Sequence, residues 1–291
     1  MTEILEIVLK ISLVIFMVGN LLDMGLRVKF QEALEGLRNA RFVVLSILWG
    51  FVLCPALAYV LAKVIPLAPP YAIGLILLGV APCAPFLPMV VDRARGDLGY
   101  AAAFMLLTSV LTVVYMPLAV PLLVTGLTAS AWTIAKPLLL FLLVPLVIGL
   151  TIQRVSAPFA AKVQPFVKTI TGIDTILMLV ACVFLYAKGF IGAIGTYAIG
   201  TQILFFSVVT ATSYGFSFGL PQKQRSVLAL GMTTRNLGAS FAPLFAIPGI
   251  DQRAIIMVAL GVPMQTGFAF LAAKWFSNQA SSGDAATKHA A

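Results

Sequence analysis

Acidic residues, histidine and cysteine are scarce in this sequence of 291 residues, which has 10 Asp and Glu, 1 His and 3 Cys. His289 stands near the C-terminal end, and Cys54 and Cys182 lie in apolar stretches where small buried cysteines are expected. The sequence contains no nucleophile–base pair, no phosphate-binding glycine loop and no cluster of metal ligands. These absences argue against an enzyme, a metal centre and an ATP-driven pump.

Apolar residues make up 61% of the chain and charged residues only 10%. A soluble domain cannot bury so much apolar surface, so we expect an all-α polytopic membrane protein in a lipid bilayer. Charged and Pro/Gly-marked connections divide the chain into about nine spans of roughly 20 or more residues. Their approximate ranges are 4–25, 41–64, 70–92, 98–125, 130–153, 164–188, 198–220, 226–248 and 253–276.

The net charge of +9 comes from basic residues that are concentrated in alternate connections. One set includes Arg27 and Arg38 after the first span and Arg93 and Arg95 after the third, whereas the opposite connections hold few. The positive-inside rule predicts an external N-terminus and a cytoplasmic C-terminus in an inner (plasma) membrane. The basic excess therefore indicates topology and does not indicate a nucleic-acid partner.

The predicted spans form a single membrane domain, residues 1–277, followed by a disordered cytoplasmic tail, 278–291. Within the domain, repeat one covers about 4–125, a connecting helix about 130–153 and repeat two about 164–277. The two repeats of four spans run in opposite directions, which predicts an inverted repeat. The sequence gives no oligomeric state.

The third span of each repeat is interrupted. In the first repeat, Pro82, Pro85 and Pro88 recur at every third residue, and each lacks an amide donor. We expect the helix to unwind there, the alternative being a proline kink that only shapes packing. In the second repeat, the polar stretch from Gly231 to Asn236 carries Arg235 at membrane depth. Paired interruptions at matching positions of inverted halves predict a transport site.

Four segments carry a resemblance to a known family. They are D-M-G-L (Asp23 to Leu26), G-F-V-L-C-P-A-L-A (Gly50 to Ala58), R-A-R-G-D (Arg93 to Asp97) and R-N-L-G-A (Arg235 to Ala239). In these the chain resembles the bile acid:sodium symporters and their bacterial relatives, in a nine-helix form. The resemblance implies two unwound helices that cross in a core domain beside a panel domain, with substrate bound between the two domains by alternating access.

The chain departs from that family at the sodium ligands. Family members that use sodium carry P-G-G-x-x-S-N in the first crossing helix and E-x-G-M-Q-N in the second. Here the Ser-Asn positions are Leu87 and Pro88, Gly231 replaces the glutamate and Arg235 the glutamine, and only Asn236 is retained. Two hydroxyl positions are Ala101 and Met105, and Gly50 replaces a further glutamine. Because a hard cation needs several oxygen ligands, we expect no sodium and no other cofactor.

Arg235 is the residue around which the predicted site is built. One hypothesis is that its guanidinium replaces the sodium charge, holds the crossing and pairs with an anionic substrate. The alternatives are that it pairs internally with Asp174 or reaches water. The candidate substrate-binding residues are Arg235, Asn236, Thr233, Thr234, Cys83, Ala84, Pro85, Phe86 and Thr108, and the coupling or gating candidates are Asp174 and Asp23.

The sequence thus favours a secondary active or facilitative transporter of a small organic anion, not coupled to sodium. An arsenite-type efflux permease that uses the Cys83 thiol is a second hypothesis. A third is a membrane receptor or scaffold that keeps the fold without transporting.

Overall fold

The computed structural model describes residues 2–124, 130–246 and 249–289, and the described part of the chain is helical with no strand. The elements in chain order are α1 (Thr2–Arg27), α2 (Phe30–Arg38), α3 (Ala40–Leu48), η1 (Trp49–Leu53), α4 (Cys54–Val64), α5 (Pro69–Val80), α6 (Leu87–Arg93), α7 (Leu98–Leu123), α8 (Ala131–Leu138), η2 (Leu139–Leu143), α9 (Val144–Val155), α10 (Ala157–Gly192), α11 (Ala198–Gly215), α12 (Gln222–Thr233), α13 (Leu237–Ala246) and α14 (Gln252–His289).

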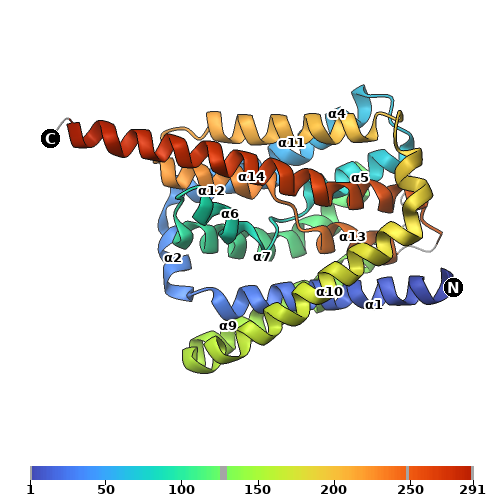
Figure 1. The fold of residues 1–291 in the computed structure, drawn as a ribbon, viewed down its shortest axis with the longest axis horizontal. Coiled ribbons are helices and arrows are strands. Elements are labelled where there is room, and N and C mark those ends of the chain that lie inside the picture. The colour runs from blue at the N-terminus through green and yellow to red at the C-terminus, as the bar shows by residue number, and fades with distance from the viewer. Residues whose placement is uncertain (1, 125–129, 247–248, 290–291) are drawn as a thin grey trace.

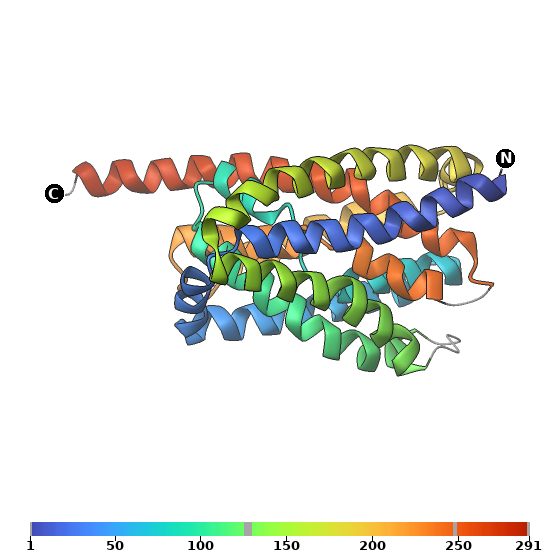
Figure 2. The same ribbon diagram turned by 90° about the horizontal axis from the view of Figure 1, so that it is seen from below.

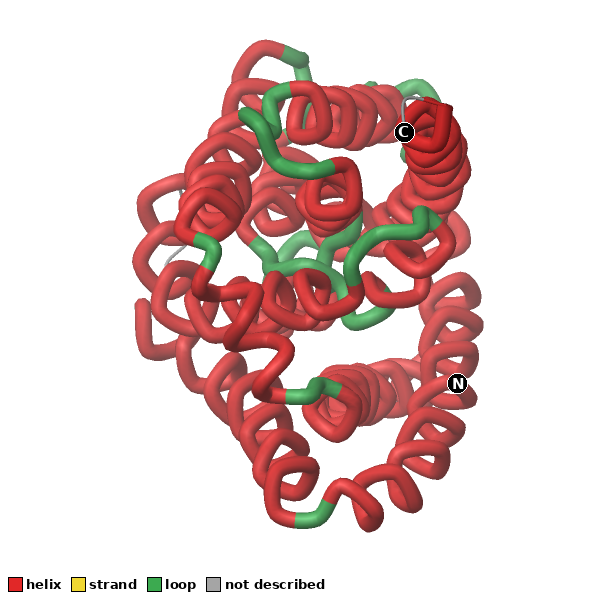
Figure 3. Tube along the Cα trace, turned by 90° about the vertical axis from the view of Figure 1, so that its left-hand side faces the viewer, coloured by secondary structure: helices red, strands yellow, loops and turns green. Residues whose placement is uncertain are grey.

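Six helical segments in the described ranges are long and apolar enough to cross a bilayer. They are Ile4–Arg27, Ala40–Val64, Leu98–Leu123, Ala131–Val155, Ala157–Gly192 and Gln252–Ser281. The helices run roughly along one direction, as the end-on view in Figure 3 shows. On α10, Phe166, Ile170 and Ile173 are exposed to 62–68%, a face that suits lipid and not water. The protein is therefore a multi-pass membrane protein.

Two of these segments contain a π-helical turn at the same distance from a proline. The turn η1 ends at Leu53, two residues before Pro55, and η2 ends at Leu143, two residues before Pro145. A proline removes one amide donor and its ring collides with the carbonyl four residues earlier. A π-helical turn is wide enough to accommodate the proline ring, so both helical segments continue past the proline without a break.

Helices α1, α9 and α10 pack together on one side of the molecule, at the bottom of Figure 1. Gly25 of α1 and Gly149 of α9 face each other so closely that a Cβ on Gly25 would lie 2.6 Å from the carbonyl oxygen of Leu146. Small residues at such points let two membrane helices approach backbone to backbone. Figure 2 shows α1 and α10 side by side along most of their length.

The C-terminal segment is helical as far as the structure describes it. The sequence predicts a disordered tail at residues 278–291; the structure describes 278–289 as part of α14, and 290–291 lie outside the described residues. The segment has no proline and contains several alanines, the residue with the highest helix propensity, so that a helix that has already formed can extend through it.

Candidate functional site

Two short non-helical segments meet inside the bundle. The first break, residues 81–86, separates α5 from α6, and the second break, residues 234–236, separates α12 from α13. The amide of Asn236 donates to the Pro82 carbonyl oxygen at 2.8 Å, and the amide of Ala84 donates to the Thr234 carbonyl oxygen at 3.3 Å. Each break therefore supplies hydrogen-bond partners that the other lost when its helix ended.

The second break is held by side chains as well as by backbone groups. Asn236 Oδ1 accepts the amide of Ala239 at 3.2 Å, an N-cap for α13. The amide of Arg235 donates to Gln265 Oε1 from α14, and the Thr234 hydroxyl donates to the Leu230 carbonyl at 2.9 Å. These bonds satisfy the polar groups that the interruption exposes at membrane depth.

The side chain of Arg235 is buried, with 1% of the residue exposed. Nη1 donates to the Ala81 carbonyl oxygen at 2.9 Å, at the C-terminal end of α5, and Nη2 contacts the Cys54 and Met232 sulfurs. The negative end of a helix dipole favours a cation at this position. Nε has no hydrogen-bond partner. Among the residues that the structure describes, Arg235 makes no ion pair, and the alternative of pairing with Asp174 is not seen.

A cavity of about 320 Å³ lies beside the first break, and we call it the crossing cavity. Of its lining residues in the described part of the chain, Arg235 is the only charged one. The lining comes from α1, the first break, α6, α10, the second break, α13 and α14, and includes Phe16, Asn20, Ala84, Pro85, Phe86, Met89, Thr175, Met178, Leu179, Arg235, Leu237, Val262, Gln265 and Thr266. Its apolar walls with a few polar groups are typical of small-molecule sites.

The structure thus places Arg235, Ala84, Pro85 and Phe86 at one cavity. Three polar residues that the sequence did not single out also line it, namely Asn20, Thr175 and Thr266. Helical spacing could have found them, because 16 and 20 on α1, 175, 178 and 179 on α10, and 262, 265 and 266 on α14 each form one helix face.

Five other candidates lie outside the lining of this cavity. Cys83 is buried with its sulfur 3.4 Å from the Thr108 hydroxyl, and Thr108 donates to the Phe104 carbonyl. The hydroxyls of Thr233 and Thr210 are 2.7 Å apart. The remaining two, Thr234 and Asn236, make the bonds of the second break given above. In the described ranges no group of three or more metal-ligating side chains is found.

The two acidic candidates have different surroundings. Asp23 is paired with Arg27 in α1, and its Oδ1 accepts the Gln164 amide at 2.7 Å. Asp174 is buried in α10 near the Ser12 hydroxyl, and its Oδ2 has no hydrogen-bond partner. Asp174 precedes Thr175, which lines the crossing cavity.

Gly231, which the sequence comparison sets against the symporter glutamate, has no room for a side chain. A Cβ on Gly231 would lie 2.3–2.8 Å from three ring atoms of Phe104, which is fully buried. Ala101 and Met105, at the two hydroxyl positions, are buried in the same helix. Buried apolar side chains therefore surround Gly231, one of the positions that the sequence comparison sets against the sodium ligands of the family.

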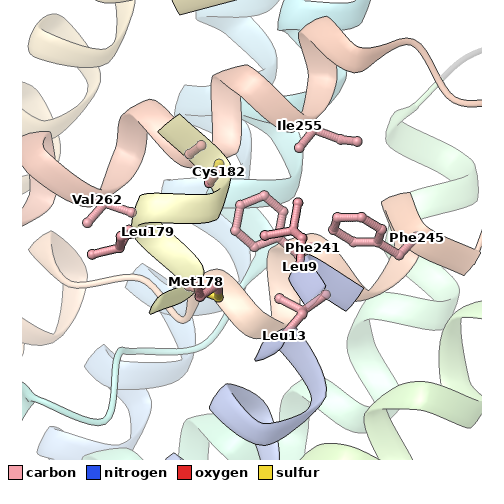
Figure 4. Close-up of a pocket in the computed structure, with 10 residues that line it drawn as sticks. Leu9, Leu13, Met178, Leu179, Cys182, Phe241, Phe245, Ile255 and Val262 are labelled. Atoms are coloured by element: carbon pink, nitrogen blue, oxygen red, sulfur yellow. The ribbon is translucent and has the colours of Figure 1, made fainter. Parts of the chain in front are cut away.

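Two further cavities lie near the crossing cavity. A small apolar cavity of about 20 Å³ is lined by side chains of α1, α10, α13 and α14, among them Leu13, Met178 and Phe245 (Figure 4). It shares Met178, Leu179 and Val262 with the crossing cavity. It also shares Leu13 and Phe245 with a larger cavity of about 520 Å³ that Lys10 and Lys136 line, here called the lysine cavity.

Comparison with protein families gives a match to the Sodium Bile acid symporter family over residues 13–193. The matched range includes the first break, whereas Arg235 and the second break lie beyond its end. A comparison with curated proteins finds no match to the chain. The family match covers more than half of the sequence and agrees with the apolar helices. The chain therefore belongs to the Sodium Bile acid symporter family, whose members are membrane transporters of the bile acid or organic anion type and not enzymes.

Proposed function

We propose that the protein is a secondary active or facilitative transporter of a small organic anion that works by alternating access without sodium. The observation that supports it best is the position of Arg235, the one charged residue among the described residues that line the crossing cavity. Its guanidinium donates to the end of α5 and contacts two sulfurs without an acidic partner, so a residue that lines the cavity carries an unpaired positive charge. A low-dielectric cavity next to an uncompensated cation attracts anions.

In this proposal Arg235 takes over the role of a sodium ion at the crossing. A bound cation would stabilise the carbonyl end of α5 and link it to the second break. The Arg235 guanidinium already donates to the Ala81 carbonyl oxygen there, and the backbone amide of Arg235 donates to Gln265. With apolar side chains around Gly231, a sodium ion would have neither a carboxylate nor enough oxygens. In this proposal the permanent charge of the Arg235 guanidinium replaces the charge of a sodium ion that binds and dissociates.

The substrate would lie in the crossing cavity with its acidic group toward the second break. Gln265 and Asn20 offer amide groups and Thr266 a hydroxyl, whereas the Thr175 hydroxyl already donates to the Thr171 carbonyl at 2.7 Å. The remaining lining is apolar, which suits a compact hydrocarbon body. A volume of about 320 Å³ is at the lower end of the range for small-molecule sites.

Alternating access would follow from nine membrane spans in two inverted repeats. The pairs α5–α6 and α12–α13 would each form one interrupted span, α11 a complete one, and the six long segments the rest. The first repeat would run to α7 and the second begin with α10. Basic residues around α2 would then face the cytoplasm, with the N-terminus outside in the inner membrane.

Proton coupling would use Asp174. Its side chain is buried at the α1–α10 contact and has an oxygen without a hydrogen-bond partner. Asp23 is the weaker candidate because Arg27 and Gln164 already hold both of its oxygens.

The test is thermal unfolding of the purified protein in detergent with a panel of small organic acids, in sodium or in choline chloride. We expect an acid to raise the unfolding midpoint equally in both salts. The shift should disappear in Arg235→Gln and persist in Arg253→Gln. Arg253 is a suitable control because it lies in an exposed pair with Asp251, whose pKa its hydrogen bonds lower.

Stabilisation that requires sodium would contradict the proposal, and this result needs only the wild-type protein, so it stands even if Arg235→Gln fails to fold. Counterflow of the stabilising acid in proteoliposomes then separates a transporter from a receptor or scaffold, which would bind without exchange.

A further inference from the structure

A pocket lies between the C-terminal end of α6 and the second half of α14, and we call it the α6–α14 pocket. Its volume is about 480 Å³, and its lining residues are Arg93, Phe270, Leu271, Lys274, Ser277 and Asn278. It shares no lining residue with the crossing cavity. Figure 1 shows α14 extending past the other helices at this end of the bundle, the end at which α2 also lies. The pocket is therefore separate from the proposed transport site.

The length of α14 places this pocket at a membrane surface. The exposed pair of Asp251 and Arg253 marks one end of the apolar part of the helix. A hydrocarbon layer spans about 20 helical residues, so its other boundary falls near Lys274. The next residue is Trp275, which is 50% exposed, and indoles are enriched at this level of a bilayer. Lys274 is thus expected at the depth of the lipid headgroups.

The lining of the pocket changes in character along α14 in the order of the layers of a membrane surface. Phe270 and Leu271 are apolar, Lys274 is basic, and Ser277 and Asn278 are polar. A phospholipid has the same order of groups, from acyl chain to phosphate to polar headgroup. The pocket therefore matches a molecule that already lies in the bilayer at this depth.

The two cations of the pocket come from different helices and have no counter-charge. Across the described ranges, Arg93 and Lys274 make no ion pair, and no acidic side chain lines the pocket. The Arg93 guanidinium lies over the ring of Phe270, 4.8 Å from its centroid. Stacking on an aromatic face holds a guanidinium in place and leaves the N–H groups at its edge able to donate. One anion can therefore bridge α6 and α14.

A second pocket at the same end of the bundle has similar residues but a different charge balance. We call it the α2–α9 pocket; it has a volume of about 430 Å³ and is lined by Lys29, Phe30, Gln31, Leu34, Gln153 and Arg154. Arg154 lies over the ring of Phe30, 5.8 Å from its centroid. Here, however, Lys29 Nζ donates to Glu32 at 2.8 Å. One of its two charges is thus compensated, whereas both charges of the α6–α14 pocket lack a partner.

We propose that the α6–α14 pocket binds an anionic phospholipid whose headgroup carries no cation, such as phosphatidylglycerol. The phosphate oxygens accept hydrogen bonds from Arg93 and Lys274, and one acyl chain lies along Leu271, which is 71% exposed. A zwitterionic headgroup would bring an ammonium group toward the two cations, and this repulsion selects an acidic lipid. In the orientation proposed above, the lipid belongs to the cytoplasmic leaflet.

The test is native mass spectrometry of the protein with dioleoyl phosphatidylglycerol or dioleoyl phosphatidylcholine in detergent. For the wild type we expect a dissociation constant for the first phosphatidylglycerol that is at least ~10-fold lower than that for phosphatidylcholine. Arg93→Gln/Lys274→Gln should lose this preference, and since both side chains are exposed, the variant should fold. The matched control is Lys29→Gln/Arg154→Gln, which removes the same number of cations from the α2–α9 pocket and should keep the preference.

Equal affinity of the wild type for the two lipids would overturn the proposal, and this result needs no variant. An equal loss of preference in both double variants would also overturn it, since only the overall charge would then matter. Displacement of the lipid by an equimolar amount of glycerol 3-phosphate would assign the pocket to a soluble phosphate ester, with the same consequence. None of these outcomes depends on binding of an organic acid at Arg235, so the proposed transport function is tested separately.

Discussion

Both breaks interrupt a helix at the place where the two segments meet, but they differ in residue types and in hydrogen bonding. The first, residues 81–86, carries no charged side chain, and Pro82 and Pro85 remove two amide donors within it. The second, residues 234–236, is half as long and keeps all its amides, which are accepted by Leu230, Gln265 and Pro82. The first break thus has fewer amide donors for its length, whereas the second satisfies every donor with a specific acceptor.

The difference also separates the walls of the cavity from its charge. Ala84, Pro85 and Phe86 of the first break line the crossing cavity with apolar groups. The second break brings a cation, and Thr234, Arg235 and Asn236 are each at most 2% exposed, whereas Phe86 of the first break is partly exposed. Substitutions within the second break or just before it should therefore affect stability more than substitutions in the first.

The largest effect is expected for Gly231→Ala, one turn before the second break. The new methyl group would overlap the Phe104 ring, whose buried position leaves it little space to move. Overpacking of this kind typically costs about 1–3 kcal/mol. The measurement is the free energy of unfolding in mixed micelles titrated with sodium dodecyl sulfate.

Gly200→Ala is the matched control, because Gly200 also lies in a helix but has nothing within 4 Å of its added Cβ. It should be neutral or slightly stabilising. Combining Gly231→Ala with Phe104→Leu should recover part of the loss. If Gly231→Ala is as harmless as Gly200→Ala, the space at position 231 is open, and a ligand for sodium could be accommodated there after all.

A smaller effect is expected for Asn236→Ala. This change removes the side-chain oxygen that caps the Ala239 amide while the backbone bond to Pro82 stays. Loss of an N-cap costs about 1 kcal/mol in the usual range of 0.5–2. Asn236→Ser, which keeps a capping oxygen, should lose less under the same unfolding assay. Equal losses in the two variants would show that the cap does not hold α13 in place.

The sequence predicts the first break better than the second, for a physical reason. The spacing of Pro82, Pro85 and Pro88 is visible in the chain, and missing amides act locally wherever the helix lies. Arg235 is conspicuous in the sequence because a charged side chain at membrane depth is unfavourable in free energy. Its partners could not be predicted, because Ala81 contributes only a backbone oxygen and Cys54 lies far away in sequence. Residues such as Asn20 and Thr175 join the site through packing of helices, which no local pattern fixes.

The smallest effect is expected for Pro85→Ala in the first break. The hydrogen bonds between the breaks use the Pro82 carbonyl and the Ala84 amide, and neither group belongs to residue 85. Pro85 is buried but lines the crossing cavity, and we expect the restored amide to be hydrated from that cavity. The change should therefore act mainly by giving the unfolded chain more freedom, which costs about 0.4–1 kcal/mol. A loss above about 2 kcal/mol would contradict this. It would show that the proline ring itself holds the crossing, so that both breaks depend on specific side chains.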